Sequence, residues 1–268
     1  MTAFTADSVS PPRAAAARPI PLMRVTQVEL RKMFDTRSGF WLIASIVITA
    51  VLATGGVILF APRDALTYST FVTAIRFPMA VILPLIAILA VTGEWSQRSG
   101  LTTFTLIPHR YRVITAKAIS SVTVGVVSVM IAFAIGALGH LLGAATTGTA
   151  LVWDVTLTQY LYFLLGNVLS LLIGFMLGVL IRASAAAIAV YFVYWFLLPT
   201  IFGLLATSVT WFRDLQPWVD FQYAQSGLFS FEGALTGEQW ANIAVTGMIW
   251  LAIPLAIGLG FVTRAEVK

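Results

Sequence analysis

Long apolar runs alternate with short polar segments along the whole chain. A helix rises about 1.5 Å per residue, so about 20 residues cross a bilayer core of about 30 Å. Six of the runs reach that length, and the pattern therefore predicts six transmembrane helices. The expected spans are Gly39–Phe60, Phe71–Thr92, Ala118–Leu142, Leu157–Ile181, Ala185–Ala206 and Ala241–Val262.

The composition indicates that lipid is the solvent of these runs. Of the 268 residues, 59% are hydrophobic and only 10% are charged, and the mean hydropathy is +0.92. Soluble domains carry about 25% charged residues, so a single water-soluble core would not hide this much apolar surface. We expect an all-α polytopic membrane protein, with one transmembrane domain over residues 21–268 and a disordered Pro- and Ala-rich tail over residues 1–20.

The segment Leu22–Arg37, before the first span, has the pattern of an amphipathic helix. Its apolar residues fall on one half of a helical wheel and most of its charges on the other, as in helices that lie in the membrane interface. Glu29 breaks the pattern because it sits within the apolar arc. A local ion pair with Lys32 and a docking contact with a partner protein are equally good explanations of that position.

The basic residues predict the orientation, because Lys and Arg concentrate on the cytoplasmic side of a membrane. Six spans put both termini on one face, and that face receives thirteen of the sixteen Lys and Arg residues. Arg63 and Arg213 fall on the opposite face, and Arg76 lies just inside a span. Both termini and the linker between the second and third spans are therefore expected in the cytoplasm.

That linker, Gly93–Lys117, is unusually long and basic. Helical hairpins in bundles are usually joined by about two to eight residues, whereas this linker has twenty-five and is not rich in Gly and Ser. Trp95–Ile107 has helical character and Pro108 ends it. A solvated loop is one explanation. The other is a segment that binds a soluble partner.

The linker sequence GEWSQRSGLTTFTLIPHRYRVITAK resembles the cytoplasmic loop of ABC-2 type permeases, especially the actinobacterial ones. The N-terminal sequence VELRKMFDTRSGFW is similar to the first helix of the same family, and the six-span layout agrees from about Val25 onward. The motifs are loose, but their order and spacing are specific. The linker residues that carry the resemblance are Glu94, Arg98, Gly100, Thr102, Thr103, Pro108, Arg110, Arg112 and Lys117.

The resemblance implies the fold of type V ABC exporters in a bacterial plasma membrane. Two six-span subunits, identical or paralogous, would form the path, and each would dock a separate ATP-binding subunit that holds ATP and magnesium. The chain itself contains no G-x-x-x-x-G-K-[ST] motif and would bind no cofactor. The implied docking residues are Glu29, Arg31, Lys32, Glu94, Arg98, Thr102, Thr103, Pro108, Arg110, Arg112 and Lys117.

Small and polar residues inside the spans suggest further sites. Gly166, Ser170, Gly174 and Gly178 are four apart and share one helix face, which would serve packing within the subunit or contact with a second copy. Arg76 would either reach the headgroups or face a protein-lined cavity, with Asp64 or another external acid as a partner. Asn167 is a second candidate for the transport path.

The segment from Thr207 to Trp240 is rich in aromatic residues but too polar to cross, so we expect amphipathic or re-entrant helices at the outer interface. Thr236 and Gln239 form a capping-box pattern just before the last span. Pro78 and Pro84 are expected to kink the second span, and Pro199 and Pro254 the fifth and sixth.

Other classes of function fit less well. An intramembrane enzyme would need paired carboxylates, a Ser–His arrangement or metal ligands, but no span has a central Asp or Glu, the two histidines are isolated, and there is no cysteine. The sequence has no basic patch interleaved with aromatic residues, which is the pattern expected of a nucleic-acid-binding protein. The sequence thus predicts a permease subunit that exports a hydrophobic or amphiphilic substrate, with an ion-coupled secondary transporter as the alternative.

Overall fold

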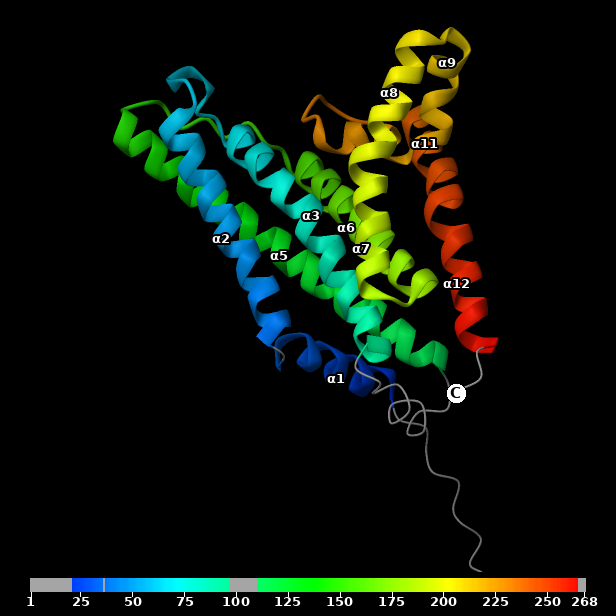
Figure 1. Cartoon of the computed structure of the whole chain (residues 1–268). Coiled ribbons are helices and arrows are strands. Elements are labelled where there is room, and N and C mark those ends of the chain that lie inside the picture. The colour runs from blue at the N-terminus through cyan, green and yellow to red at the C-terminus, as the bar shows by residue number, and fades with distance from the viewer. Residues whose placement is uncertain (1–20, 36, 97–109, 265–268) are drawn as a thin grey trace, which may run out of the picture.

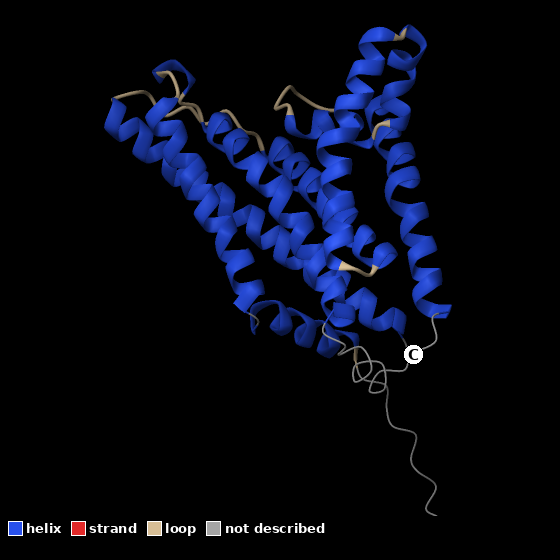
Figure 2. Cartoon of the chain, in the orientation of Figure 1, coloured by secondary structure: helices blue, strands red, loops and turns tan. Residues whose placement is uncertain are grey.

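The computed structural model describes residues 21–35, 37–96 and 110–264, and every regular element in these ranges is helical (Figure 2). The first half of the chain forms long helices, and the second half forms shorter ones. The elements are α1 (Leu22–Asp35), α2 (Arg37–Phe60), the 3₁₀ turn η1 (Arg63–Ala65), α3 (Tyr68–Ser96), α5 (Arg110–Thr147), α6 (Leu157–Ile181), α7 (Ser184–Phe192), the π-helix η2 (Val193–Leu197), α8 (Leu198–Ser208), α9 (Thr210–Val219), α10 (Phe221–Gln225), the 3₁₀ turn η3 (Ser226–Phe229), α11 (Gly237–Gly247), the π-helix η4 (Met248–Ala252) and α12 (Ile253–Arg264).

Six helical segments of the described chain are long and apolar enough to cross a membrane, as the sequence predicts. The protein is therefore a membrane protein. The first, fifth and last spans leave most of their surface uncovered within the chain, and that surface is apolar. Lipid tails cover such surfaces without any cost in buried polar groups.

The bundle is organised around α3. This helix contacts α2, α5, α6 and α7, and its contact with α6 is the most extensive in the molecule. The amphipathic α1 lies crosswise under one end of the bundle, where α12 also ends, whereas α9 lies at the opposite end (Figure 1). These are called the α1 end and the α9 end below.

The helices on both sides of the polar linker extend into it. Helix α3 continues through Gly93 to Ser96, and α5 starts at Arg110 and runs for 38 residues, well beyond both predicted limits of the third span. The polar residues at these ends continue the two helices, since solvation of side chains outside the bilayer does not interrupt backbone hydrogen bonding. Most of the helix expected over Trp95–Ile107 lies outside the described residues, as does the tail 1–20.

Local signals explain several element boundaries. Arg182 ends α6 in the left-handed region, with φ 59° and its N–H donated to the Gly178 carbonyl, which makes the tight turn before α7. The capping box of Thr236 and Gln239 starts α11, as predicted. Thr156 and Gln159 form a second capping box at the start of α6.

The glycines of α6 allow its close contact with α3. A Cβ built on Gly174 would clash with the backbone of Pro84, including its Cα at 2.6 Å, and one on Gly178 would meet Ile88 and Val91. A Cβ on Gly166 would overlap the ring of Phe229. The three glycines therefore pack within the chain, and this side of α6 is occupied without a second copy.

Candidate functional site

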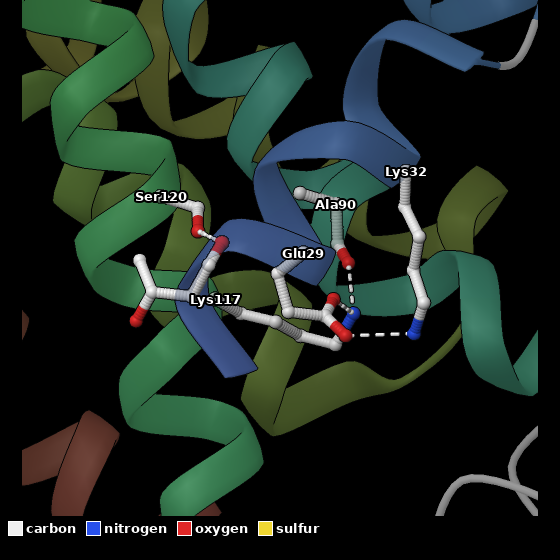
Figure 3. Close-up of polar contacts among 6 residues, drawn as sticks. Glu29, Lys32, Ala90, Lys117 and Ser120 are labelled. Atoms are coloured by element: carbon white, nitrogen blue, oxygen red, sulfur yellow. Dashed lines mark hydrogen bonds and ion pairs between the residues drawn. The ribbon is translucent and has the colours of Figure 1, made fainter. Parts of the chain in front are cut away.

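The first candidate site is the junction of α1, α3 and α5. Glu29, on α1, faces the bundle and is only 4% exposed. Its carboxylate accepts from the Nζ atoms of Lys117 at 2.5 Å and Lys32 at 2.7 Å (Figure 3). This explains the position of Glu29 within the apolar arc of α1: it faces a buried cation rather than lipid.

Two further hydrogen bonds close the junction. Lys117, itself 5% exposed, also donates to the Ala90 carbonyl of α3 at 3.1 Å. Ser120 donates to the Thr26 carbonyl of α1 at 3.1 Å (Figure 3). Three helices that are distant in the sequence are thus joined by one buried ion pair and its neighbours, and α1 cannot move without displacing charges that have no access to water.

The junction contains or borders several of the predicted docking residues. Glu29 and Lys117 bind each other inside it, so they hold α1 in place and do not present charge to the surface. Arg31 and Lys32 are exposed on α1, and Arg112 is half-buried in the first turn of α5. Glu94 and Arg110 lie in the helix ends beside the linker. The remaining docking residues, Arg98, Thr102, Thr103 and Pro108, lie outside the described residues.

The second candidate site is a partly open cleft near the α9 end of the bundle. The volume that a water-sized group can occupy inside it is about 30 Å³, and the rest of the hollow is open to the surroundings. Both predicted pathway residues, Arg76 and Asn167, line this cleft, together with Ser170 from the small-residue face of α6. The other lining residues are Ala80, Tyr191, Tyr194, Trp195, Gln222, Gln225 and Phe229.

Arg76 does not make the expected ion pair with Asp64. Within the described ranges it has no carboxylate within salt-bridge distance, and its guanidinium carbon instead lies 4.0 Å from the centre of the Phe229 ring. Stacking on a ring face is favourable for a guanidinium but does not neutralise its charge. Arg76 therefore brings a positive charge into a cleft lined partly by aromatic residues.

The walls of the cleft are held together by hydrogen bonds from other lining residues. The Tyr191 hydroxyl donates to the Ala80 carbonyl of α3 at 2.5 Å. Gln222 Nε2, on α10, donates to the Tyr194 carbonyl at 2.7 Å. Asn167 donates within its own helix to the Phe163 carbonyl at 2.8 Å. The cleft is thus a built feature of α3, α6, α7, η2 and α10.

The π-helix η2 supplies one of these contacts. Its wider turn sends the Leu198 N–H to the Val193 carbonyl, five residues back, so the Tyr194 carbonyl is released from the helix and accepts from Gln222 instead. Such π-turns are frequent at functional sites. The hydrophobic pattern predicts neither this π-helix nor the role of Gln222. The available signal in the sequence is Pro199, which has no N–H to give to the Trp195 carbonyl in an α-helical turn.

Comparisons with known proteins add no assignment to either site. No protein-family model matches the chain, and no curated protein matches it. In the described part of the chain, no three His, Asp or Glu side chains come together as a metal ion would require. The interpretation of both sites depends on their geometry and chemistry.

Proposed function

We propose that the chain is the membrane-spanning permease subunit of an ATP-binding cassette exporter. It sits in a bacterial plasma membrane with both termini and the linker in the cytoplasm. A separate subunit binds and hydrolyses ATP, because this chain has no phosphate-binding loop. The complete transporter contains a second permease subunit, identical or paralogous.

The observation that carries this proposal is the Glu29–Lys117 junction. It joins α1 to α3 and α5 at the end of the bundle where the linker residues leave α3 and enter α5. A force applied to α1 or to the linker is therefore passed to α3, and from α3 to the helices packed against it, among them α2, α5, α6 and α7. This is the arrangement that a subunit driven from outside requires.

The proposed mechanism follows from this mechanical connection. The ATP-bound partner binds one arrangement of α1, α3 and α5 more tightly than the other. The difference in binding free energy between the two arrangements shifts the population of the bundle and exposes the substrate path alternately to each side. The buried ion pair keeps the three helices moving as one unit.

The proposal is tested by affinity purification from membranes of the native host in mild detergent. We expect a chain with a Walker A motif to co-purify and the complex to hydrolyse ATP. The double variant Arg110→Glu/Arg112→Glu should reduce its recovery at least tenfold. Arg63→Glu/Arg213→Glu, at the opposite end of the bundle, is the matched control and should not reduce it.

Transport by the purified chain alone, driven by an ion gradient, would contradict the proposal and favour the secondary transporter. Equal recovery of the ATPase with both double variants would reject the linker as the docking segment.

A further inference from the structure

The cleft near the α9 end contains a positive charge, that of Arg76, which pairs with no carboxylate among the described residues. Arg76 lies eight residues into α3, within a membrane-spanning segment. Charged groups in spans are rare and usually pair with another charge or face a polar cavity. The one acid of the neighbouring α10 turn, Asp220, is already engaged: it caps α10 and accepts from Gln216 Nε2 at 3.1 Å.

A second polar group that lines the cleft, the side-chain amide of Gln225, has a hydrogen-bond acceptor without a donor. Gln225 is 5% exposed, and its Nε2 donates to the Phe221 carbonyl at 3.0 Å. Its Oε1 is buried and has no hydrogen-bond partner in the structure. A buried acceptor without a donor costs about 1–3 kcal/mol, so a ligand that supplies the donor is stabilised there.

The remaining walls are suited to an apolar chain. Tyr191, Tyr194, Trp195 and Phe229 line the cleft. Beyond Trp195, Phe196 and Leu197 of the same π-turn are about half exposed on the surface of the bundle. A molecule with its headgroup in the cleft can therefore extend its tail over a surface that already faces lipid.

We propose that this cleft binds the headgroup of an anionic amphiphile that carries a hydroxyl or amine donor. The anionic oxygens pair with the Arg76 guanidinium, and the donor binds Gln225 Oε1. Binding itself does not depend on transport. The further assignment of this amphiphile as the exported molecule rests on the proposed function.

The test measures binding of short-chain lipids to the purified full-length chain in a neutral detergent, by native mass spectrometry and by the shift in melting temperature. Dioctanoyl phosphatidylglycerol supplies the anion and the hydroxyl. Dioctanoyl phosphatidylmethanol has the anion without the hydroxyl, dioctanoyl phosphatidylcholine has no net charge, and inorganic phosphate has no tail. We expect phosphatidylglycerol to bind at least tenfold more tightly than each of the other three.

Variants assign the binding to the cleft. Arg76→Gln should reduce phosphatidylglycerol affinity at least tenfold, whereas Arg63→Gln, an exposed arginine on the same side of the bundle, should not change it. Gln225→Leu should abolish the preference for phosphatidylglycerol over phosphatidylmethanol and leave Arg76-dependent binding in place. Arg76→Lys keeps the charge and should retain most of the affinity, which separates loss of charge from loss of fold.

Equal affinity for phosphatidylglycerol and phosphatidylcholine, or an Arg76→Gln variant that binds like the native chain, would overturn the proposal. So would an Arg76→Lys variant that keeps its melting temperature but binds as weakly as Arg76→Gln.

The source of the amphiphile is decided in vesicles that contain the chain and its ATPase partner. ATP-dependent, Arg76-dependent movement of a fluorescent phosphatidylglycerol across the bilayer identifies cargo, and binding without movement identifies a resident membrane lipid. If the chain co-purifies with an ATPase but does not bind phosphatidylglycerol in the cleft, this inference alone is rejected. If the chain binds phosphatidylglycerol but no ATPase co-purifies with it, the proposed function alone is rejected.

Discussion

Single residues determine how α1 is attached to the bundle. The carboxylate of Glu29 and the ammonium of Lys117 are both buried, so each would be costly without the other. Lys32 also binds Glu29, but its side chain is 46% exposed and its charge is screened by water. The two lysines therefore contribute very differently to the same carboxylate.

Replacing Glu29 should show this difference. Glu29→Ala removes the buried carboxylate that pairs with the buried ammonium of Lys117, and we expect a loss of about 3–5 kcal/mol in the free energy of unfolding. Lys32→Ala, the control, should cost under about 1 kcal/mol. Thermal unfolding in detergent measures both. Equal losses would show that the buried pair does not hold α1.

Asp154, in the loop before α6, should make the stability of the fold depend on pH. Its two carboxylate oxygens accept from the backbone N–H of Ser69 at 2.8 Å and from the Ser69 hydroxyl at 2.6 Å, at the start of α3. Partial burial raises the pKa of this carboxyl, but hydrogen bonds, first those from Ser69 and then those from the Thr67 side chain and its own backbone, outweigh the burial, and the net pKa lies below its ordinary value of 3.8. The ionised form is therefore the one that the fold stabilises.

The sign of the pH dependence follows. A carboxyl whose pKa is lower in the folded state than in the unfolded state stabilises the fold at any pH above its unfolded-state pKa. This stabilisation is lost as the pH falls through the folded-state pKa. We expect the native chain to be more stable than Asp154→Asn at pH 7, and the difference in melting temperature to shrink below about pH 4. A difference that stays constant down to pH 2 would assign it to shape rather than charge.

Sequence reasoning at the residue scale identified the unusual side chains but not all of their partners. Glu29 is conspicuous because it interrupts an apolar arc, and its ion pair with Lys32, three residues away, was one of the two explanations. Lys117 is 88 positions away. Nothing in the local pattern of either residue specifies a contact that depends on how α1 folds back under α5.

Among the elements, two spans share an interruption that hydrophobicity does not show. The π-helices η2 and η4 each end two residues before a proline, Pro199 and Pro254. The prolines were predicted to kink these spans. The structure accommodates each with a wider turn, in which the N–H before the proline binds the carbonyl five residues back, and in η2 the released carbonyl becomes part of the cleft wall.

The contact of α6 with α3 predicts a difference between two glycines. Gly174→Ala places a methyl group against the Pro84 backbone, which cannot move away as a side chain would, and should cost about 1–3 kcal/mol. Gly203→Ala, in α8, meets nothing within 4 Å and should be neutral or stabilising by up to about 1 kcal/mol. Melting temperatures compare the two, and equal effects would contradict the packing argument.

At the scale of the whole molecule, the bundle has two ends of different character. The α1 end carries the helix ends beside the linker, and the α9 end carries short helices (Figure 1). The buried ion pair lies at the α1 end, and the cleft lies nearer the α9 end. The distribution of Lys and Arg predicts that the α1 end is cytoplasmic. A partner that acts at the α1 end would therefore influence the cleft only through the long helices between them.

The absence of cysteine from the chain allows a direct test of this orientation. We expect a membrane-impermeant maleimide to label Ala234→Cys in intact cells, because residue 234 is exposed near the α9 end. Thr103→Cys, in the linker, should react only after the membrane is permeabilised. The reverse pattern would place the linker outside the cell and contradict the proposed docking of an ATPase there.

The sequence by itself determined the membrane character, the six helices long and apolar enough to span a membrane, and the capping box at Thr236, because hydrophobicity, helical period and capping act over a few neighbouring residues. The tertiary structure decided what those elements do together: the partner of Glu29, the side of α6 that packs on α3, and the joining of Arg76, Asn167 and Gln225 in one cleft. These depend on contacts between segments tens of residues apart, where the energy lies in burial and hydrogen bonding that no local pattern records.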